Sequence, residues 1–282
     1  MKYLKTGILL AIMCCLLSAV CYADPAADAP ETDPTPRIGI ISAMSNEISL
    51  LLENAEISYV KTIGGEDFHA GTLQGQDVVI LKAGIGKVLA ASGMSAMLNN
   101  FNITKVLFTG VAGGVGDETQ VLDIVVATDL VQHDYGQMTN DGFVWTKGYI
   151  DDGRYACSED LVDRAYEAAG EVVGADHVFK GTIATGDQFI ASESYVKRLQ
   201  EEFNALACEM EGAAVALVCR QYEVPFVVIR SMSDKADGIA RDTYLNFSDE
   251  AADRSGSIIM KMLDSFAEEE SGDAAPELQE AA

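Results

Sequence analysis

The sequence predicts a three-layer α/β fold with a central mixed, mostly parallel sheet flanked by helices. Apolar runs of strand length alternate along the chain with longer segments of helical periodicity. The apolar runs lack the polar–apolar alternation of a half-exposed strand, as expected for a sheet that helices cover on both faces. With 49% hydrophobic and 22% charged residues among 282, the chain can bury the large core that this fold needs.

The strands are expected at short apolar runs, and a further short strand should end at Cys208. The strand candidates are 37–43, 78–81, 106–108, 124–127, 183–184 and 226–229. Helices are expected where apolar residues recur every three or four positions, as Ile48, Leu51 and Leu52 do after the first strand. The helix candidates are 46–53, 86–99, 158–172, 192–202, 210–222 and 249–266.

The first 23 residues have the features of a secretory signal peptide. Lys2 and Lys5 precede an apolar run from Gly7 to Val20, and Ala23 provides a small residue before a cut. That run is shorter than the roughly 20 residues that span a bilayer. A lipoprotein would need a small residue before an acylated cysteine, but Met13 precedes Cys14 and Val20 precedes Cys21. We therefore expect cleavage after Ala23, no stable membrane insertion afterwards, and an exported chain that is periplasmic or secreted.

Three segments make up the rest of the predicted organisation. Residues 24–36 hold four prolines and four acidic residues with no basic one, a composition typical of a flexible spacer. Residues 37–266 form the single folded domain. Residues 267–282 are acidic and rich in small residues, which predicts a solvated tail.

Charge and cysteine usage exclude several classes of protein. The formal net charge of −25 repels phosphate backbones and anionic lipid surfaces, so we expect no nucleic-acid partner. Outside the signal peptide the cysteines are Cys157, Cys208 and Cys219, without C-x-x-C spacing. Buried free thiols are the favoured interpretation, and a Cys208–Cys219 disulfide is the alternative.

Two glycine-rich segments, 84–87 and 109–116, follow predicted strands. Such segments allow a ligand to approach the backbone closely. Neither matches a phosphate-binding P-loop or a dinucleotide fingerprint. His69, His133 and His177 are scattered without metal-ligand spacing, so we expect neither a metal nor an organic cofactor.

Acidic residues follow several predicted strands. Glu47 lies just beyond the first strand, Glu209 and Glu211 flank Met210 at a strand-to-helix junction, and Asp234 ends the most hydrophobic strand. The carboxyl ends of strands are where α/β proteins usually place ligands. An acidic residue also favours the first turn of a helix, so position alone leaves both interpretations open.

The motifs taken together, in this order, resemble the 5′-methylthioadenosine/S-adenosylhomocysteine nucleosidases of the nucleoside phosphorylase superfamily. The matching segments are Ile38–Met44 with Glu47, Ala83–Lys87, Thr109–Gly114, Gly186–Ile190, Glu209–Glu211 and Arg230–Asp234. The resemblance implies the phosphorylase/hydrolase-like form of the three-layer fold. It also implies hydrolysis of the bond between ribose C1′ and adenine N9 through a transition state resembling an oxocarbenium ion.

The resemblance assigns a role to each carboxyl group. Asp234 matches the acid that protonates adenine N7, a task that needs a raised pKa. Glu211 matches the carboxylate that binds the ribose hydroxyls and faces the developing cation. Glu47 matches the base that activates water at C1′, with Arg230 as a supporting partner.

The resemblance also implies which residues surround the nucleoside. Met210 should pack on ribose and Phe189 on adenine, while the Ile190 backbone should recognise the adenine edge. The remaining residues expected at the site are Met44, Ala83, Gly84, Ser233, Tyr244 and Phe247. Members of the family form dimers, and the segment 132–138, often contributed across the dimer, departs here from the common pattern. The 5′ substituent is therefore left open, and a homodimer is implied by resemblance alone.

Three alternatives remain on the sequence. One is a nucleoside phosphorylase, although Glu47 would repel the phosphate dianion that such an enzyme uses. Another is an aminodeoxyfutalosine hydrolase, whose substrate shares the adenine–ribose half. The third is an exported nucleoside-binding protein without catalysis, although pure binding needs no water-activating carboxylate.

Overall fold

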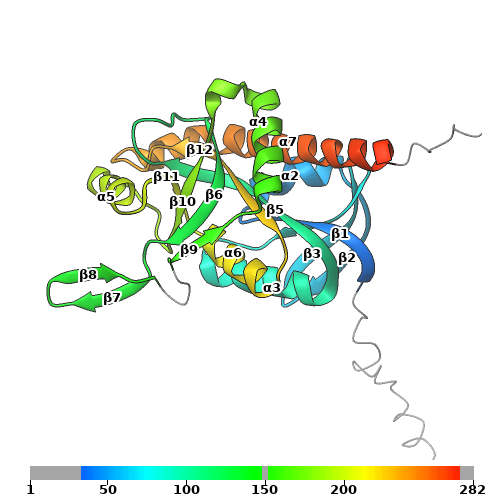
Figure 1. Ribbon diagram of the computed structural model, residues 1–282, viewed down its shortest axis with the longest axis horizontal. Coiled ribbons are helices and arrows are strands. Elements are labelled where there is room, and N and C mark those ends of the chain that lie inside the picture. Colours follow the sequence, from blue (N-terminus) through cyan, green and yellow to red (C-terminus); the bar gives the residue numbers. More distant parts are fainter. Residues whose placement is uncertain (1–32, 148–151, 274–282) are drawn as a thin grey trace, which may run out of the picture. The chain divides into compact units, whose positions relative to one another are not determined.

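The computed structural model describes residues 33–147 and 152–273, and a ten-stranded mixed sheet lies at its centre (Figure 1). The main order of strands is β11-β10-β6-β12-β5-β1-β4-β3-β2, and β9 pairs with β6. Their bounds are β1 Asp33–Ser42, β2 Glu56–Ile63, β3 Glu66–Leu73, β4 Gln76–Lys82, β5 Phe101–Gly114, β6 Ile124–Gln132, β9 Arg154–Ala156, β10 Val178–Thr185, β11 Ala205–Glu209 and β12 Phe226–Asp234.

The sheet closes on itself at one side. Strand β12 pairs in parallel with β5 and antiparallel with β6, and β10 pairs in parallel with both β6 and β11. The end of the long strand β5 then pairs antiparallel with β11, with Gly113 opposite Cys208. This last pairing joins β5, β12, β6, β10 and β11 into a ring, so the ends of β5, β11 and β12 meet.

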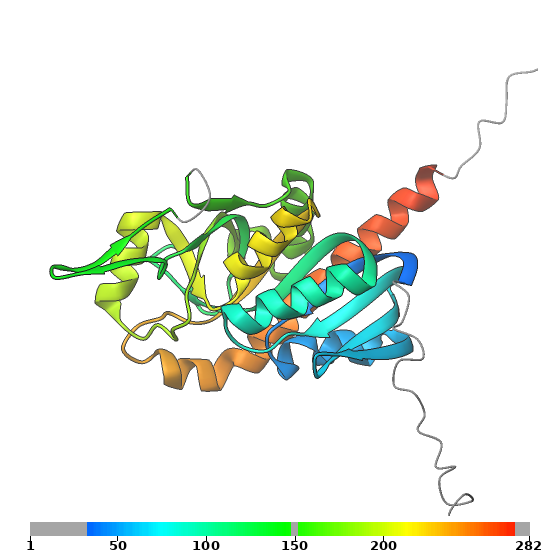
Figure 2. The ribbon, with the colours of Figure 1, turned by 90° about the horizontal axis from the view of Figure 1, so that it is seen from below.

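Helices cover both faces of the sheet, which confirms the predicted fold class. Helices α2 (Ser45–Asn54), α4 (Glu159–Val173) and α7 (Ala240–Asp273) lie on one side, and α3 (Lys87–Asn100) and α6 (Gly212–Gln221) lie on the other (Figure 1). Helix α5 (Glu193–Phe203) packs beside β10 and β11, and a short 3-10 helix spans Ala175–His177. The hairpin of β7 (Gly136–Thr139) and β8 (Gly142–Trp145) projects away from the rest of the described chain (Figure 2).

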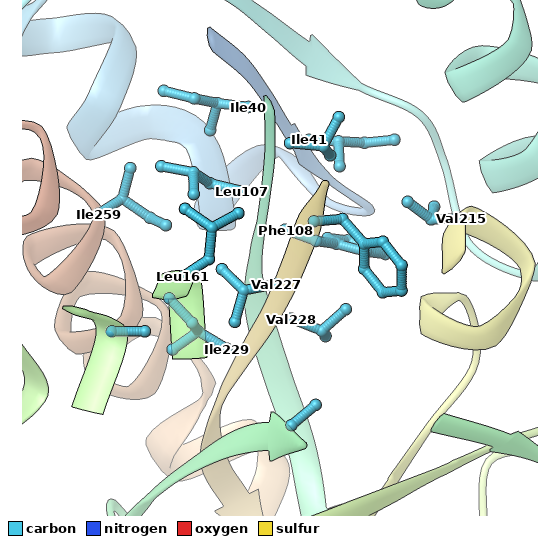
Figure 3. Close-up of a cluster of buried hydrophobic side chains, with 14 of the residues drawn as sticks. Ile40, Ile41, Leu107, Phe108, Leu161, Val215, Val227, Val228, Ile229 and Ile259 are labelled. Carbon is cyan, nitrogen blue, oxygen red and sulfur yellow. The ribbon is translucent and has the colours of Figure 1, made fainter. Parts of the chain in front are cut away.

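The hydrophobic core has two layers because successive strand side chains point to opposite faces. Ile40, Leu107 and Val227 point toward α7 and α4, where Ile259 and Leu161 meet them (Figure 3). Their neighbours Ile41, Phe108 and Val228 point toward Val215 of α6. The continuous apolar runs of the sequence therefore correspond to strands that are buried on both faces.

The ends of the folded unit lie outside the boundaries that we predicted. Strand β1 begins at Asp33, four residues before the expected start, and pairs with β5 through Asp33 and Pro36. Its prolines occupy a strand end, a position that proline tolerates. Helix α7 begins at Ala240 rather than 249 and runs to Asp273. The predicted signal peptide (residues 1–23), residues 24–32 of the predicted spacer and residues 274–282 of the predicted tail lie outside the described residues.

The sequence patterns missed the antiparallel strands β2 and β3. These two strands form the edge of the sheet beyond β4, and polar residues such as Lys61, Glu66 and Asp67 interrupt their apolar pattern. Among the described residues Cys157, Cys208 and Cys219 are all free and buried, as we expected. No helix in the described ranges is long and apolar enough to span a membrane.

Candidate active site

An apolar cavity of about 380 Å³ lies where the ends of β1, β5, β11 and β12 meet. This volume is in the usual range for a small-molecule site. The carboxyl groups of Glu47, Glu209, Glu211 and Asp234 are part of its lining, although most of the lining is apolar. The rest of the lining is Ala43, Met44, Ile85, Val111, Ala112, Gly113, Gln188, Phe189, Ile190, Cys208, Met210, Ser233 and Tyr244.

Glu47 is held by the backbone around it. It is buried in the first turn of α2 and accepts hydrogen bonds from the amides of Ala43 (2.9 Å), Met44 (2.8 Å) and Val111 (2.9 Å). Burial raises the pKa of Glu47, and the charge of Arg230 and the three amides lower it less than burial raises it. The carboxylate is therefore fixed in position and is a stronger base than an exposed glutamate.

Asp234 ends β12 and is 2% exposed. One of its oxygens accepts a 2.7 Å hydrogen bond from the amide of Ala236, and the other accepts a 2.9 Å bond from the hydroxyl of Ser233. Burial raises the pKa of Asp234, and these two hydrogen bonds oppose the rise only in part. The side chain can therefore retain a proton at a higher pH than an exposed aspartate can.

Glu211 precedes α6 and accepts a 2.8 Å hydrogen bond at Oε1 from the amide of Gly86. Its Oε2 lies 3.9 Å from Nη2 of Arg230. Burial, followed by the negative charge of Glu209, raises the pKa of Glu211 to about 8. A carboxyl group that titrates near neutral pH is thus exposed to the cavity.

Glu209 is a site residue that the sequence analysis did not assign. Its Oε2 forms a 2.7 Å ion pair with Nη2 of Arg230 and accepts hydrogen bonds from the amides of Glu211 (3.1 Å) and Gly212 (2.7 Å). Its Oε1 accepts a hydrogen bond from the hydroxyl of Thr185. Glu209 therefore fixes both the guanidinium group and the first turn of α6, and the motif of two acids around Met210 was the signal that could have revealed it.

Arg230 lies beneath the cavity and is 1% exposed. Its guanidinium carbon lies 4.0 Å from the ring centre of Phe108. Among the described residues its Nε and Nη1 have no hydrogen-bond partner. A Cβ on Gly110 would lie 2.8 Å from Nη1 of Arg230 and 2.6 Å from Oε1 of Glu47, so the absence of a side chain at Gly110 leaves room for both groups.

Two aromatic rings lie at the cavity. Phe189 and Tyr244 meet edge to face with their centroids 5.9 Å apart, and Phe189 remains 51% exposed. The Tyr244 hydroxyl donates to the sulfur of Met44 at 3.3 Å. These contacts connect the loop after β10, the first turns of α7 and the end of β1.

The structure brings most of the residues predicted for the site to this cavity. Glu47, Asp234, Met44, Phe189, Ile190, Met210, Glu211, Ser233 and Tyr244 line it. Ala83, Gly84 and Phe247 are not part of its lining: Ala83 is buried in the core, a Cβ at Gly84 would lie 2.8 Å from Cδ1 of Leu89, and Phe247 is 36% exposed on α7. Within 33–147 and 152–273 no group of three histidine, cysteine or acidic residues could hold a metal ion.

The arrangement supports acid–base chemistry on a small apolar ligand. Buried carboxyl groups with raised pKa values lie on several sides of one cavity, and an arginine balances the charge beneath them. Such groups can donate a proton to one part of a bound molecule and accept one from another.

Comparison with known proteins identifies the family of this fold and site. Residues 37–264 match the model of the Phosphorylase superfamily. The 5′-methylthioadenosine/S-adenosylhomocysteine nucleosidase of Bacillus thuringiensis is 37% identical over 238 residues, which cover 81% of this chain and 98% of the relative.

Solved structures give the same result. The nucleosidase of the same name from Neisseria meningitidis, in complex with methylthio-immucillin-A, has a TM-score of 0.75 and 35% identity and covers 81% of this chain and 99% of its own. The futalosine hydrolase of Helicobacter pylori has a TM-score of 0.73 and 35% identity, with 82% and 98% covered. The chain therefore belongs to the phosphorylase superfamily and, within it, to the 5′-methylthioadenosine/S-adenosylhomocysteine nucleosidases, which makes it an N-glycosyl hydrolase.

Proposed function

We propose that this protein hydrolyses 5′-methylthioadenosine and S-adenosylhomocysteine to adenine and the 5-thio-substituted ribose. The observation that carries the proposal is the convergence of Glu47, Glu211 and Asp234 on one apolar cavity. The reaction needs three tasks, namely to protonate the leaving base, to bind the ribose and to activate water. Three separately positioned carboxyl groups can divide these tasks among them.

Asp234 is the proposed general acid at adenine N7. Burial raises the pKa of its carboxyl group above the ordinary value of an aspartate, which favours the protonated form that a general acid needs. A proton delivered to N7 lets the base leave as a neutral molecule, which lowers the barrier to breaking the bond from C1′ to N9. Ser233 contacts the carboxyl group through its hydroxyl and so orients the acid.

Glu47 is the proposed base for water, with Arg230 as its supporting partner. The three amides that bind Glu47 leave its carboxylate oriented. Oε1 of Glu47 and the unpartnered Nη1 of Arg230 both lie within 3 Å of a single point beside Gly110. A water molecule in the cavity would donate a hydrogen bond to Glu47, and the charge of Arg230 beside that carboxylate favours the ionised form that accepts the proton.

Glu211 is the proposed ligand of the ribose hydroxyls. Because Oε1 is held by Gly86, Oε2 is the oxygen left to face the sugar. A negative charge here would also stabilise the cation that develops at the ribose. Met210 supplies apolar contact with the sugar, while Phe189 offers a half-exposed ring on which adenine can stack, and the Ile190 backbone recognises the adenine edge.

One assay tests the reaction and its nucleophile. The purified chain is incubated with methylthioadenosine at low and high phosphate, and free adenine and the sugar product are measured. We expect adenine and free methylthioribose at a rate that does not depend on phosphate. A sugar 1-phosphate as the main product would assign the chain to the phosphorylases, and tight binding without adenine release would indicate a receptor.

Aminodeoxyfutalosine is a second candidate substrate, supported by the similarity to the Helicobacter pylori futalosine hydrolase. It shares the adenine–ribose half of methylthioadenosine, so the proposed carboxyl roles stay the same. The ratio of kcat/KM for methylthioadenosine to kcat/KM for aminodeoxyfutalosine decides between the two.

We further propose export and dimerisation. Export rests on the signal-peptide pattern of residues 1–23. N-terminal sequencing of the protein from the periplasm or medium should begin at Asp24, and an intact Met1 there would contradict cleavage. A homodimer is supported by apolar residues that are exposed near the cavity, among them Ile85, Val88 and Leu89, and light scattering of the purified chain measures it.

A further inference from the structure

A partly buried ion-pair cluster lies beside the cavity without forming its lining. Nζ of Lys87, at the start of α3, lies 2.6 Å from Oδ1 of Asp134 and 3.3 Å from Oε1 of Gln132, both at the end of β6. The Lys87 and Asp134 side chains are only 17% and 15% exposed. No step of the proposed reaction uses these groups.

The cluster forms a closed ring of contacts through a third element, the loop after β10. The second oxygen of Asp134 accepts a 2.9 Å hydrogen bond from the amide of Asp187. The Asp187 carboxylate then accepts a 2.8 Å bond from the amide of Lys87. Side chains and backbone thus connect α3, β6 and the loop after β10 in one circuit.

The start of α3 depends on this circuit because it has no cap of its own. Its N-cap residue is Gly86, which has no side chain to accept from the first amides of the helix. Two carboxylates from distant parts of the chain take that role: Glu211 binds the amide of Gly86 and Asp187 binds the amide of Lys87, both at 2.8 Å. The positive end of the α3 dipole favours both negative charges.

The two carboxylates are connected to different halves of the cavity. Glu211 faces the position proposed for ribose. Asp187 immediately precedes Gln188, Phe189 and Ile190, all of which line the cavity on the side proposed for adenine. A shift of the first turn of α3 would therefore move two groups together: the Gly86 amide that binds Glu211, and the loop 186–190 on the side proposed for adenine.

We propose that Lys87, Asp134 and Asp187 form a positioning cluster that fixes the base-side loop 186–190 and Glu211 relative to each other. This inference rests on the proposed function for the identity of the two halves of the ligand. The pKa of Asp134 agrees with this positioning role. Burial alone would raise the pKa of Asp134, but the hydrogen bond and charge of Lys87 and the amide of Asp187 outweigh burial and lower it.

The variants Lys87→Met, Asp134→Asn and Asp187→Ala test the cluster, with Lys87→Arg as the conservative variant. The ion pair between Lys180 and Asp163 is a matched control, since its N–O distance is also 2.6 Å and neither residue lines the cavity. Asp163→Asn therefore removes a pair of equal N–O distance at a more exposed position, where the side chains are 34% and 68% exposed. For each variant we would measure kcat and KM for methylthioadenosine and the inhibition constant of free adenine.

We expect each cluster variant to lose kcat/KM on the order of 10-fold or more, because displaced contacts misalign the reacting groups. The inhibition constant of adenine should rise, and Lys87→Arg should recover most of the loss. The double variant Lys87→Met/Asp134→Asn should lose little more than either single variant, because the two residues form one unit. A lower melting temperature with unchanged kinetic constants would overturn the proposal, because it would show a role in stability alone.

Amide hydrogen exchange tests the positioning cluster without relying on the proposed function. In Asp134→Asn, amides in both 84–90 and 186–190 should exchange faster, although neither segment contains the substitution, while Asp163→Asn should leave both unchanged. This result would stand even if the unaltered chain released no adenine, which would refute the proposed function alone. Unchanged exchange in either segment would overturn the coupling.

Discussion

Strand β12 has two halves that are equally buried and differ in what surrounds them. Phe226–Ile229 pack among apolar side chains of α4, α6 and α7 (Figure 3). Arg230–Asp234 continue the same strand and are all buried, but Arg230, Ser233 and Asp234 contact carboxylates, hydroxyls and backbone amides, while Met232 stays in the hydrophobic core. One half contributes hydrophobic stabilisation, whereas the other keeps charges away from water at a cost to stability.

The unfavourable burial of charged groups in β12 occurs in the half that lies next to the cavity. A core built for stability alone would continue the apolar run of Phe226–Ile229 to the end of the strand. The charged half is instead adjacent to the cavity, where raised pKa values are useful for proton transfer. Substitutions in the charged half should therefore reduce catalysis most, and those in the apolar half should reduce stability alone.

The largest expected effect is on turnover. Asp234→Asn and Glu47→Gln should each lower kcat by on the order of 10²-fold or more, since an amide cannot supply or accept the proton at these positions. Asp234→Asn keeps the side-chain shape and can keep both contacts, because the Ser233 hydroxyl can accept as well as donate, so its melting temperature should stay close to that of the unaltered chain. In Glu47→Gln the side-chain NH2 faces a backbone N–H that the carboxylate accepted from, so a lower melting temperature is expected there. Near-native kcat in Asp234→Asn across a range of pH would contradict the assignment of the acid.

Arg230→Met should have the largest effect on stability. The change leaves Glu209 without its 2.7 Å ion pair and leaves Glu47 and Glu211 without their nearest positive charge. Breaking a buried pair in this way costs about 3–5 kcal/mol, measured as the free energy of unfolding in urea. A cost below about 1 kcal/mol would contradict the view that the ion pair of Arg230 with Glu209 stabilises the fold.

Ile229→Val gives the matching change in the apolar half and a smaller expected effect. Ile229 is fully buried next to Arg230, and removing one methylene from a packed core costs about 0.5–1.5 kcal/mol. The kcat and KM for methylthioadenosine should not change. A loss of kcat comparable to that of Asp234→Asn would show that the two halves of β12 do not divide stability and chemistry.

The apolar half of β12 and most other strands could be predicted from sequence because they are continuous apolar runs. The closure of the sheet could not, because it depends on a long-range pairing of Gly113 with Cys208, and no local pattern encodes which strands meet. The edge strands β2 and β3 were missed because of their local sequence. Their half-exposed surface admits many polar residues, which obscures the strand pattern.

The part of the candidate site that lies within the sequence motifs could be predicted. Glu47, Glu211 and Asp234 each follow a strand, so their convergence on one cavity could be anticipated from the resemblance. Glu209 was recognised in its motif but not given a role, because its partners Arg230 and Thr185 come from other strands. The cluster of Lys87, Asp134 and Asp187 was missed for the same reason, since its three members are distant in sequence and meet only in the fold.

The last and smallest expected effect is a dependence of stability on pH. The pKa of Glu211 is about 8 in the folded chain, against an ordinary value of 4.5, and burial raises the pKa values of Glu47 and Asp234 as well. Between these limits the folded state holds protons that the unfolded state has released. Stability should therefore be greatest near the lower limit and should fall as the pH rises from about 4.5 toward 8.

Glu211→Gln tests this dependence because it removes the contribution of one group and keeps its shape. The free energy of unfolding in urea would be measured for both proteins at pH values of about 5.5, 7 and 8.5. The decline should be shallower in Glu211→Gln. Asp134 contributes in the opposite sense, since its lowered pKa favours the folded state above its ordinary value of 3.8, but that contribution is lost only in more acidic solution. Parallel curves for the two proteins would show that Glu211 is ionised throughout this range, with Arg230 as the nearby positive charge that stabilises it.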